Sequence, residues 1–155
     1  MSQMENGERL MRRWFEEVWN KRNEAAIDEM FKAGGAAHGV PTPDSVAHGP
    51  EEFKVHYRSL CGAFPDIRID IKDVIAVGNR VAVRWRATGT HLGDNLGITA
   101  TGRPIVLDGA TFCIVEGSQI TEGWNLMDMG YLMQSLRSVA AASSDVELEV
   151  IAQRG

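Results

Sequence analysis

The side chains that can carry acid–base chemistry in this chain are a small set of histidines and carboxylates. His38 and His91 fall in stretches expected to be loops, where an imidazole can donate a hydrogen bond to an oxygen that gains negative charge during a reaction. Loop histidines are commonly just exposed, so both candidates have a plain structural alternative. His56 lies on an expected helix and His48 directly precedes a helix start, and we interpret both as structural.

These side chains do not form a metal-binding pattern. The four histidines show neither HxH nor HExxH spacing, and the two cysteines, Cys61 and Cys113, are isolated in the sequence. No GxxxxGK occurs, and no expected strand leads into GxGxxG, so a nucleotide-binding loop is not indicated. We therefore predict no metal and no cofactor.

Two carboxylates near the end of the last expected strand are of interest. Asp128 lies between an apolar strand and an apolar helix, so its carboxylate can either cap that helix or act as an acid or base. Glu122 shares the alternation of Ile120 and Trp124, which places it on the inner face unless it forms an ion pair at the sheet edge.

The elements that must position these residues follow from hydrophobic periodicity. Apolar side chains recur at helical spacing in the N-terminal part, whereas isoleucines alternate with charged residues from Ile67 to Ile71, as in a strand with one wet face. Helices are expected over 7–21, 23–31 and 50–64 and again after Asp128, and strands over 67–77, 80–91, 103–115 and 119–127. Residues 34–49 lack periodicity and are expected to be a loop at a pocket mouth. This order predicts an α+β domain with N-terminal helices packed on a curved antiparallel sheet.

Large apolar side chains on the inner faces of these elements predict a mainly apolar pocket. The expected pocket residues are Trp14, Phe15 and Val18 from the first helix, Trp85 from the second strand and Trp124 from the last strand. His91 shares the alternation of Trp85 if no bulge intervenes. Each of these aromatic residues can also be ordinary core.

Composition and charge limit the possible partners. The net charge is −5, and 16 Lys and Arg residues are scattered among 21 Asp and Glu residues, so nucleic acid is not an expected partner. The N-terminal stretch is polar, and no apolar run approaches the length of a membrane span. We expect a cytoplasmic protein with one domain over 1–137 and a tail over 138–155 that forms no separate domain.

Six short motifs in a fixed order resemble the SnoaL-like polyketide cyclase family. They are Gly49-Pro50-Glu51, Phe64-Pro65-Asp66-Ile67, Val81-Ala82-Val83-Arg84-Trp85, Gly89-Thr90-His91, Thr101-Gly102-Arg103 and Trp124-x-x-x-Asp128, and the resemblance spans about Glu8 to Leu136. It implies a cone-shaped half-barrel like that of nuclear transport factor two, commonly in a dimer. It also implies cofactor-free intramolecular aldol cyclisation of polyketide esters, with the acid/base role falling on Asp128.

These observations favour a cofactor-independent cyclase or isomerase that acts on a hydrophobic carbonyl compound. A non-catalytic binding or assembly module with the same pocket is the alternative from another class, because one fold hosts many functions. An epoxide hydrolase or dehydratase is a further alternative, although the single Arg-x-Asp that would suit a hydrolase, Arg68-Ile69-Asp70, is expected to face solvent. We also predict a homodimer through an outer sheet face that carries Arg84, Arg86, Val106 and Phe112.

Overall fold

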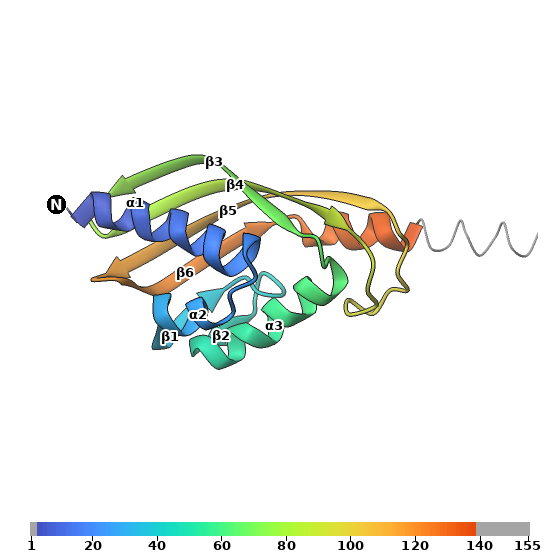
Figure 1. The fold of residues 1–155 in the computed structure, drawn as a ribbon, viewed down its shortest axis with the longest axis horizontal. Coiled ribbons are helices and arrows are strands. Elements are labelled where there is room, and N and C mark those ends of the chain that lie inside the picture. The colour runs from blue at the N-terminus through green and yellow to red at the C-terminus, as the bar shows by residue number, and fades with distance from the viewer. Residues whose placement is uncertain (1–2, 139–155) are drawn as a thin grey trace, which may run out of the picture.

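A computed structural model describes residues 3–138 and consists of helices packed on one face of a curved sheet (Figure 1). The elements are α1 Gln3–Trp14, the π-helix η1 Phe15–Asn20, α2 Ala25–Met30, β1 Phe31–His38, β2 Val46–His48, α3 Gly49–Ala63, β3 Arg68–Val77, β4 Arg80–Thr90, β5 Pro104–Glu116 and β6 Gln119–Met127. Residues 129–138 form a final helix beyond the end of β6. The α+β prediction is confirmed. Apart from Ser138, the tail expected over 138–155 lies outside the described residues.

The six-stranded sheet has the order β2-β1-β6-β5-β4-β3. Its neighbours pair in antiparallel fashion except β1 and β6, which run parallel with His38 opposite Trp124. The sheet is therefore mixed, and the expectation of a purely antiparallel sheet is corrected at this pair. Antiparallel strands can be joined by a hairpin turn, whereas parallel strands need a longer connection. The sequence therefore contains no hairpin-turn signal that would predict the pairing of β1 with β6.

Two strands occupy the segment that was expected to be mainly loop. β1 includes Gly34 and Gly35, which weaken a strand pattern in the sequence because they carry no side chain. At Gly35 a Cβ atom would lie 2.9 Å from both the Phe31 ring and the backbone oxygen of Thr121 in β6. The missing side chain thus permits the close approach of the two strands that sequence periodicity does not reveal.

The first helix differs from its expected range of 7–21 because it begins at Gln3 and widens into a π-helix after Trp14. Lys21 donates its backbone N–H to the carbonyl of Glu16 at 2.8 Å, a five-residue step. The Asn20 side chain then binds the backbone of Ile69 in β3 through both its amide nitrogen, at 3.0 Å, and its oxygen, at 2.7 Å. The widened turn is therefore held directly against the sheet.

A bulge in β6 decides which side chains face the helices. Val115 lies opposite Ile120 and Ile114 lies opposite Glu122, so Thr121 has no partner in β5. A residue inserted in one strand reverses the alternation beyond it. Ile120 consequently faces the core before the bulge, and Gly123 faces it after the bulge.

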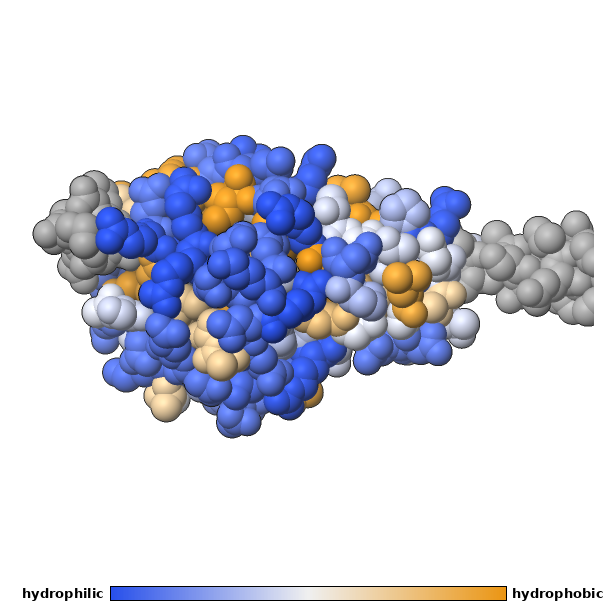
Figure 2. All heavy atoms as spheres, viewed as in Figure 1, coloured by the Kyte–Doolittle hydropathy of each residue, from blue (hydrophilic) through white to orange (hydrophobic). Residues whose placement is uncertain are grey.

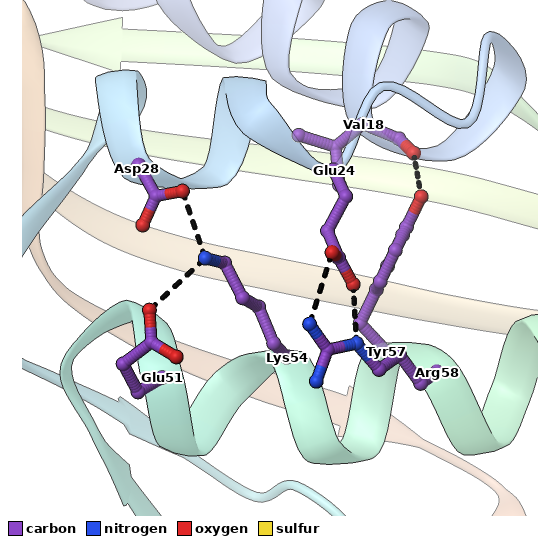
Figure 3. Close-up of polar contacts among 7 residues, drawn as sticks. All are labelled: Val18, Glu24, Asp28, Glu51, Lys54, Tyr57 and Arg58. Carbon is purple, nitrogen blue, oxygen red and sulfur yellow. Dashed lines mark hydrogen bonds and ion pairs between the residues drawn. The ribbon is translucent and has the colours of Figure 1, made fainter.

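Ion pairs attach α3 to α2 across the covered side of the sheet (Figure 3). The buried Lys54 Nζ donates to Asp28 Oδ2 at 2.8 Å. The Arg58 guanidinium forms a bidentate ion pair with the Glu24 carboxylate, with N–O distances of 2.6 and 3.0 Å. The pairs leave the apolar faces of the helices free to pack on the sheet. The opposite, solvent-facing side of these helices is mainly hydrophilic (Figure 2). Within residues 3–138, no helix is long and apolar enough to cross a membrane.

Candidate active site and pocket

The helices and the inner face of the sheet enclose an apolar cavity of about 80 Å³. Its walls include Trp14, Phe15, Trp19, Phe53, Trp85 and Met127. Among the described residues, no aspartate, glutamate, lysine or arginine lines it. Such a space suits an uncharged, mainly hydrophobic ligand.

Trp85 forms the floor of the cavity and is only 5% exposed. Its indole lies over Gly109 of β5, where the Cβ of any other residue would overlap the ring. Phe15 packs beside it, with ring centroids 6.4 Å apart. Glycine in β5 therefore makes room for the largest side chain of the cavity floor.

A chain of hydrogen bonds crosses the cavity wall from β4 to β1. The indole N–H of Trp85 donates to Thr111 Oγ1 at 3.0 Å, and Thr111 Oγ1 donates to Asn125 Oδ1 at 3.1 Å. Asn125 Nδ2 donates to the backbone oxygen of His38 at 3.2 Å. The chain places one side-chain amide at the edge of an otherwise apolar space.

A wider groove of about 490 Å³ lies at the end of β6, and its walls include the outward-facing Trp124 and Leu126. Asn125 and Met127 line both spaces. The groove also contains His38, Asp108, Trp124 and Asp128. The acidic side chains therefore line the groove and not the cavity, whereas His38 lines the groove and His56 lines the cavity.

Asp128 lies in the groove, is exposed and caps the final helix. Its Oδ1 accepts the backbone N–H of Tyr131 at 3.1 Å. Among the described residues, Oδ2 has no hydrogen-bond donor. The capping alternative from the sequence is thus realised in the geometry, and one carboxylate oxygen remains open to the groove.

Glu122, Trp124 and His38 lie together on the outer face of the sheet. His38 Nε2 is 2.7 Å from Glu122 Oε2, and its ring stacks on Trp124 with centroids 5.3 Å apart and an interplanar angle of 11°. The alternation predicted that Trp124 lines the pocket wall, and this is corrected here; for Glu122 it left an inward position and an ion pair at the sheet edge open, and the carboxylate contacts His38. The bulge at Thr121 reverses the alternation, so both side chains point away from the cavity.

His91 is fully buried, beside Phe64 of the cavity wall, with ring centroids 5.7 Å apart. Its Nδ1 accepts the backbone N–H of Thr101 at 3.1 Å, which places the ring proton of a neutral imidazole on Nε2. Among the described residues, Nε2 has no hydrogen-bond partner. His91 is not one of the residues that line the cavity or the groove, so the structure does not bring it together with His38 or Asp128.

Val18 belongs to the core rather than to the cavity surface. It is completely buried, and its carbonyl accepts the Tyr57 hydroxyl at 2.9 Å (Figure 3). Instead, α1 presents Trp14 to the cavity, and the π-helix η1 presents Phe15 and Trp19. The π-turn changes the angular spacing of these side chains, which a regular helical period does not describe.

Several polar cavity residues have no clear signal in the sequence. Thr111 and Asn125 are single polar residues within strand patterns, and His56, assigned to structure, lines the cavity. Burial raises the pKa of Tyr57 to about 12 and, independently, the pKa of Cys113 to about 12. Both side chains are therefore uncharged at neutral pH, which preserves the apolar character of the wall.

Neither a metal site nor a hydrolase-like arrangement is visible in the described part of the chain. Residues 3–138 contain no group of three His, Cys, Asp or Glu side chains placed to hold a metal ion. Arg68 and Asp70 form an ion pair at 3.4 Å, and both side chains are largely exposed, outside the cavity and the groove. This position gives no support to an arginine-centred epoxide hydrolase.

The fold and the sequence together identify the family. The model of the SnoaL-like polyketide cyclase family matches residues 9–136, so the chain belongs to this family. A search of curated proteins finds no significant match.

Solved structures support the same fold. A candidate polyketide cyclase from Acidithiobacillus ferrooxidans is 28% identical, with a TM-score of 0.74 and coverage of 90% of this chain and 99% of that protein. A candidate SnoaL-like polyketide cyclase from Jannaschia sp. CCS1 is 20% identical, with a TM-score of 0.77 and coverage of 86% and 92%. AclR from Streptomyces galilaeus, a candidate hydroxylase, is 21% identical, with a TM-score of 0.76 and coverage of 87% and 98%. Since cyclase and hydroxylase labels occur on one fold, the activity must be argued from the site.

Proposed function

We propose that this protein binds a hydrophobic carbonyl compound in the cavity and closes or isomerises it by cofactor-independent acid–base chemistry. One observation carries the proposal. The cavity, which no aspartate, glutamate, lysine or arginine among the described residues lines, shares Asn125 and Met127 with a groove that contains the carboxylate of Asp128. The apolar part of a ligand can enter the cavity while its reacting carbon remains at the carboxylate.

In this proposal Asp128 is the general base. It takes a proton from the carbon next to a carbonyl, and the electron pair of that C–H bond forms an enolate. In an aldol closure the enolate carbon bonds to a second carbonyl carbon of the same molecule, whose oxygen then receives the proton, so no redox partner is needed. The Asp128 oxygen that does not cap the helix supplies the base.

His38 and His91 have different places in this scheme. His38 lies in the groove, so its ring can assist the proton transfer to the new hydroxyl. Its contact with Glu122 orients the ring through Nε2 and leaves Nδ1 for this step. His91 acts through the packing of Phe64, because its buried ring lies behind the cavity wall.

The cavity must enlarge to admit a polyketide-sized molecule. Its volume of about 80 Å³ is smaller than the ~150 Å³ apolar space that accommodates benzene in an engineered protein. Met127 lines both spaces, and methionine side chains adapt readily to different shapes. We propose that movement of this side chain joins the cavity to the groove when a ligand binds.

The decisive variant is Asp128→Asn, tested by product formation from a panel of hydrophobic keto esters. Asparagine caps a helix about as well as aspartate, so folding should be retained while the base is removed. We expect turnover to fall by roughly two to four orders of magnitude with little change in binding. The matched control is Asp108→Asn, in the same groove. Normal turnover of Asp128→Asn on a confirmed substrate would contradict the mechanism.

A binding module without catalysis is the second candidate function. It is favoured by the absence of a carboxylate from the described cavity wall and by the capping role of Asp128. The same panel separates the two functions, because a module binds several compounds and releases each one chemically unchanged. Native mass spectrometry detects the binding, and chromatography of the released compound detects any reaction.

We also propose that the protein is a homodimer that pairs through the outer face of the sheet. Val106 and Phe112 are large apolar side chains of β5 with exposed fractions of 56% and 46%. Both alternate with the buried residues of that strand and therefore face outward. An apolar surface of this kind is typical of a protein–protein interface.

A further inference from the structure

We infer that Asn125 is the residue that orients the ligand, by donating a hydrogen bond from its side-chain amide to the ligand's carbonyl oxygen where the cavity meets the groove. This inference rests on the proposed function, because it supposes that a carbonyl compound occupies the cavity. It adds a direction of binding, with the carbonyl at β6 and the hydrocarbon part toward Trp85.

The orientation of the Asn125 amide follows from its neighbours. The indole nitrogen of Trp85 can only donate, so Thr111 Oγ1 accepts there and uses its own proton toward Asn125. The backbone oxygen of His38 can only accept, so the Asn125 atom 3.2 Å from it is the nitrogen. These two contacts determine which end of the amide is oxygen and which is nitrogen.

One proton of this amide is left for a ligand. The nitrogen carries two protons, and among the described residues it has one acceptor, the His38 oxygen. Asn125 lines both the cavity and the groove, and its side-chain amide contacts Thr111, which lines the cavity as well. A carbonyl oxygen in an otherwise apolar space gains most from such a donor, because an unpaired polar group is costly to bury.

The backbone around Asn125 holds this arrangement in place. Gly39 adopts a φ of +80° and lies so close to the Asn125 carbonyl that a Cβ atom would overlap it. Gly39 directly follows His38, whose carbonyl accepts the amide proton. The close packing of β1 on β6 therefore fixes the acceptor as well as the amide, so the donor is preorganised for a ligand.

Asn125 is also positioned to affect reactivity. It precedes Asp128 by three positions in the sequence, and both residues line the groove. A donor on the carbonyl oxygen stabilises the negative charge that the oxygen gains when the base removes a proton from the adjacent carbon. Binding direction and enolate stabilisation thus come from the same N–H group.

The test compares molecules that differ only at the carbonyl. Acetophenone is paired with isopropenylbenzene, and cyclohexanone with methylenecyclohexane, so that C=O is replaced by C=CH₂ at nearly constant shape. We expect each ketone to bind wild-type protein roughly 2–10-fold more tightly than its alkene, as one hydrogen bond implies. In Asn125→Leu the ratio should fall to about one with alkene affinity retained. The control Thr121→Val, on the same strand as Asn125, removes a hydroxyl that donates to the Ile114 carbonyl of β5 and should keep the wild-type ratio.

A spectroscopic measurement keeps the test decisive if Asn125→Leu does not fold. In wild-type protein, the NMR signal of the Asn125 side-chain amide should shift with acetophenone and not with isopropenylbenzene, and the C=O stretch of bound acetophenone should move to lower frequency. A ratio of one in wild type, an equal shift with both compounds or failure of both ketones to bind would overturn the inference. None of these readouts needs turnover, so an inactive Asp128→Asn and a lost carbonyl preference are separate results.

Discussion

Replacement of Trp85 tests the packing of the cavity floor. Burial of a tryptophan removes about 200 Å² from water, which at ~25 cal/mol per Å² corresponds to about 5 kcal/mol as an upper value. The alanine methyl and partial collapse of the space reduce this value, so Trp85→Ala should lower the free energy of unfolding by about 3–5 kcal/mol. Since Trp85 is 5% exposed and packs on Phe15, little of this area is already in water.

The hydrogen bond from Trp85 to Thr111 contributes a separable part of this loss. Trp85→Phe, Thr111→Val and the double variant form a thermodynamic cycle, measured by urea unfolding followed by circular dichroism. We expect a coupling energy of about 0.5–1.5 kcal/mol, the usual net value of one hydrogen bond. A loss of less than about 1 kcal/mol in Trp85→Ala would refute the tight packing of Trp85. A coupling energy of zero would refute the hydrogen bond between Trp85 and Thr111.

Two further predictions concern Tyr57 and the outer sheet face. Burial raises the pKa of Tyr57 from 10.0 to about 12, so between these pH values the unfolded chain releases a proton that the folded protein keeps. The free energy of unfolding should therefore fall as the pH rises through this range. Measured by urea unfolding, Tyr57→Phe should lose less of it over the same range than wild type does. If the variant keeps the wild-type pH dependence, Tyr57 is not the cause of the loss. If Phe112 lies in a homodimer interface, light scattering should give a dimer mass for wild type and a monomer mass for Phe112→Glu. A monomeric wild type would rule out the proposed pairing.

The sequence was most informative where side-chain alternation reflects burial. Ile67 and Ile69 are buried as alternation requires, and the β3 to β6 order followed from such patterns and from turn residues. β1 escaped prediction because its backbone pairs with β6 in parallel, which leaves no turn signature between the partners. Hydrophobic alternation and turn residues thus predict the antiparallel strands β3 to β6, but they do not predict β1, which pairs with β6 in parallel.

The candidate site was less predictable because it depends on single-residue shifts. Trp14, Phe15 and Trp85 reach the cavity, as large inward-facing residues should. Trp124 does not, because one unpaired residue at Thr121 reverses the facing of the rest of β6. The same reversal turns Asn125 toward the cavity, and a lone asparagine between Trp124 and Leu126 gives no sequence signal of that position.

The parallel contact between β1 and β6 has a consequence for the order of folding. It joins His38 to Trp124 across most of the described chain, so closing this loop costs more chain entropy than forming the local hairpins. Among the strands of the described residues, β6 is also the last to leave the ribosome, and it carries Asn125. A nascent chain that has formed β3, β4 and β5 therefore has the Trp85 floor of the cavity before it has the strand that carries the proposed ligand donor.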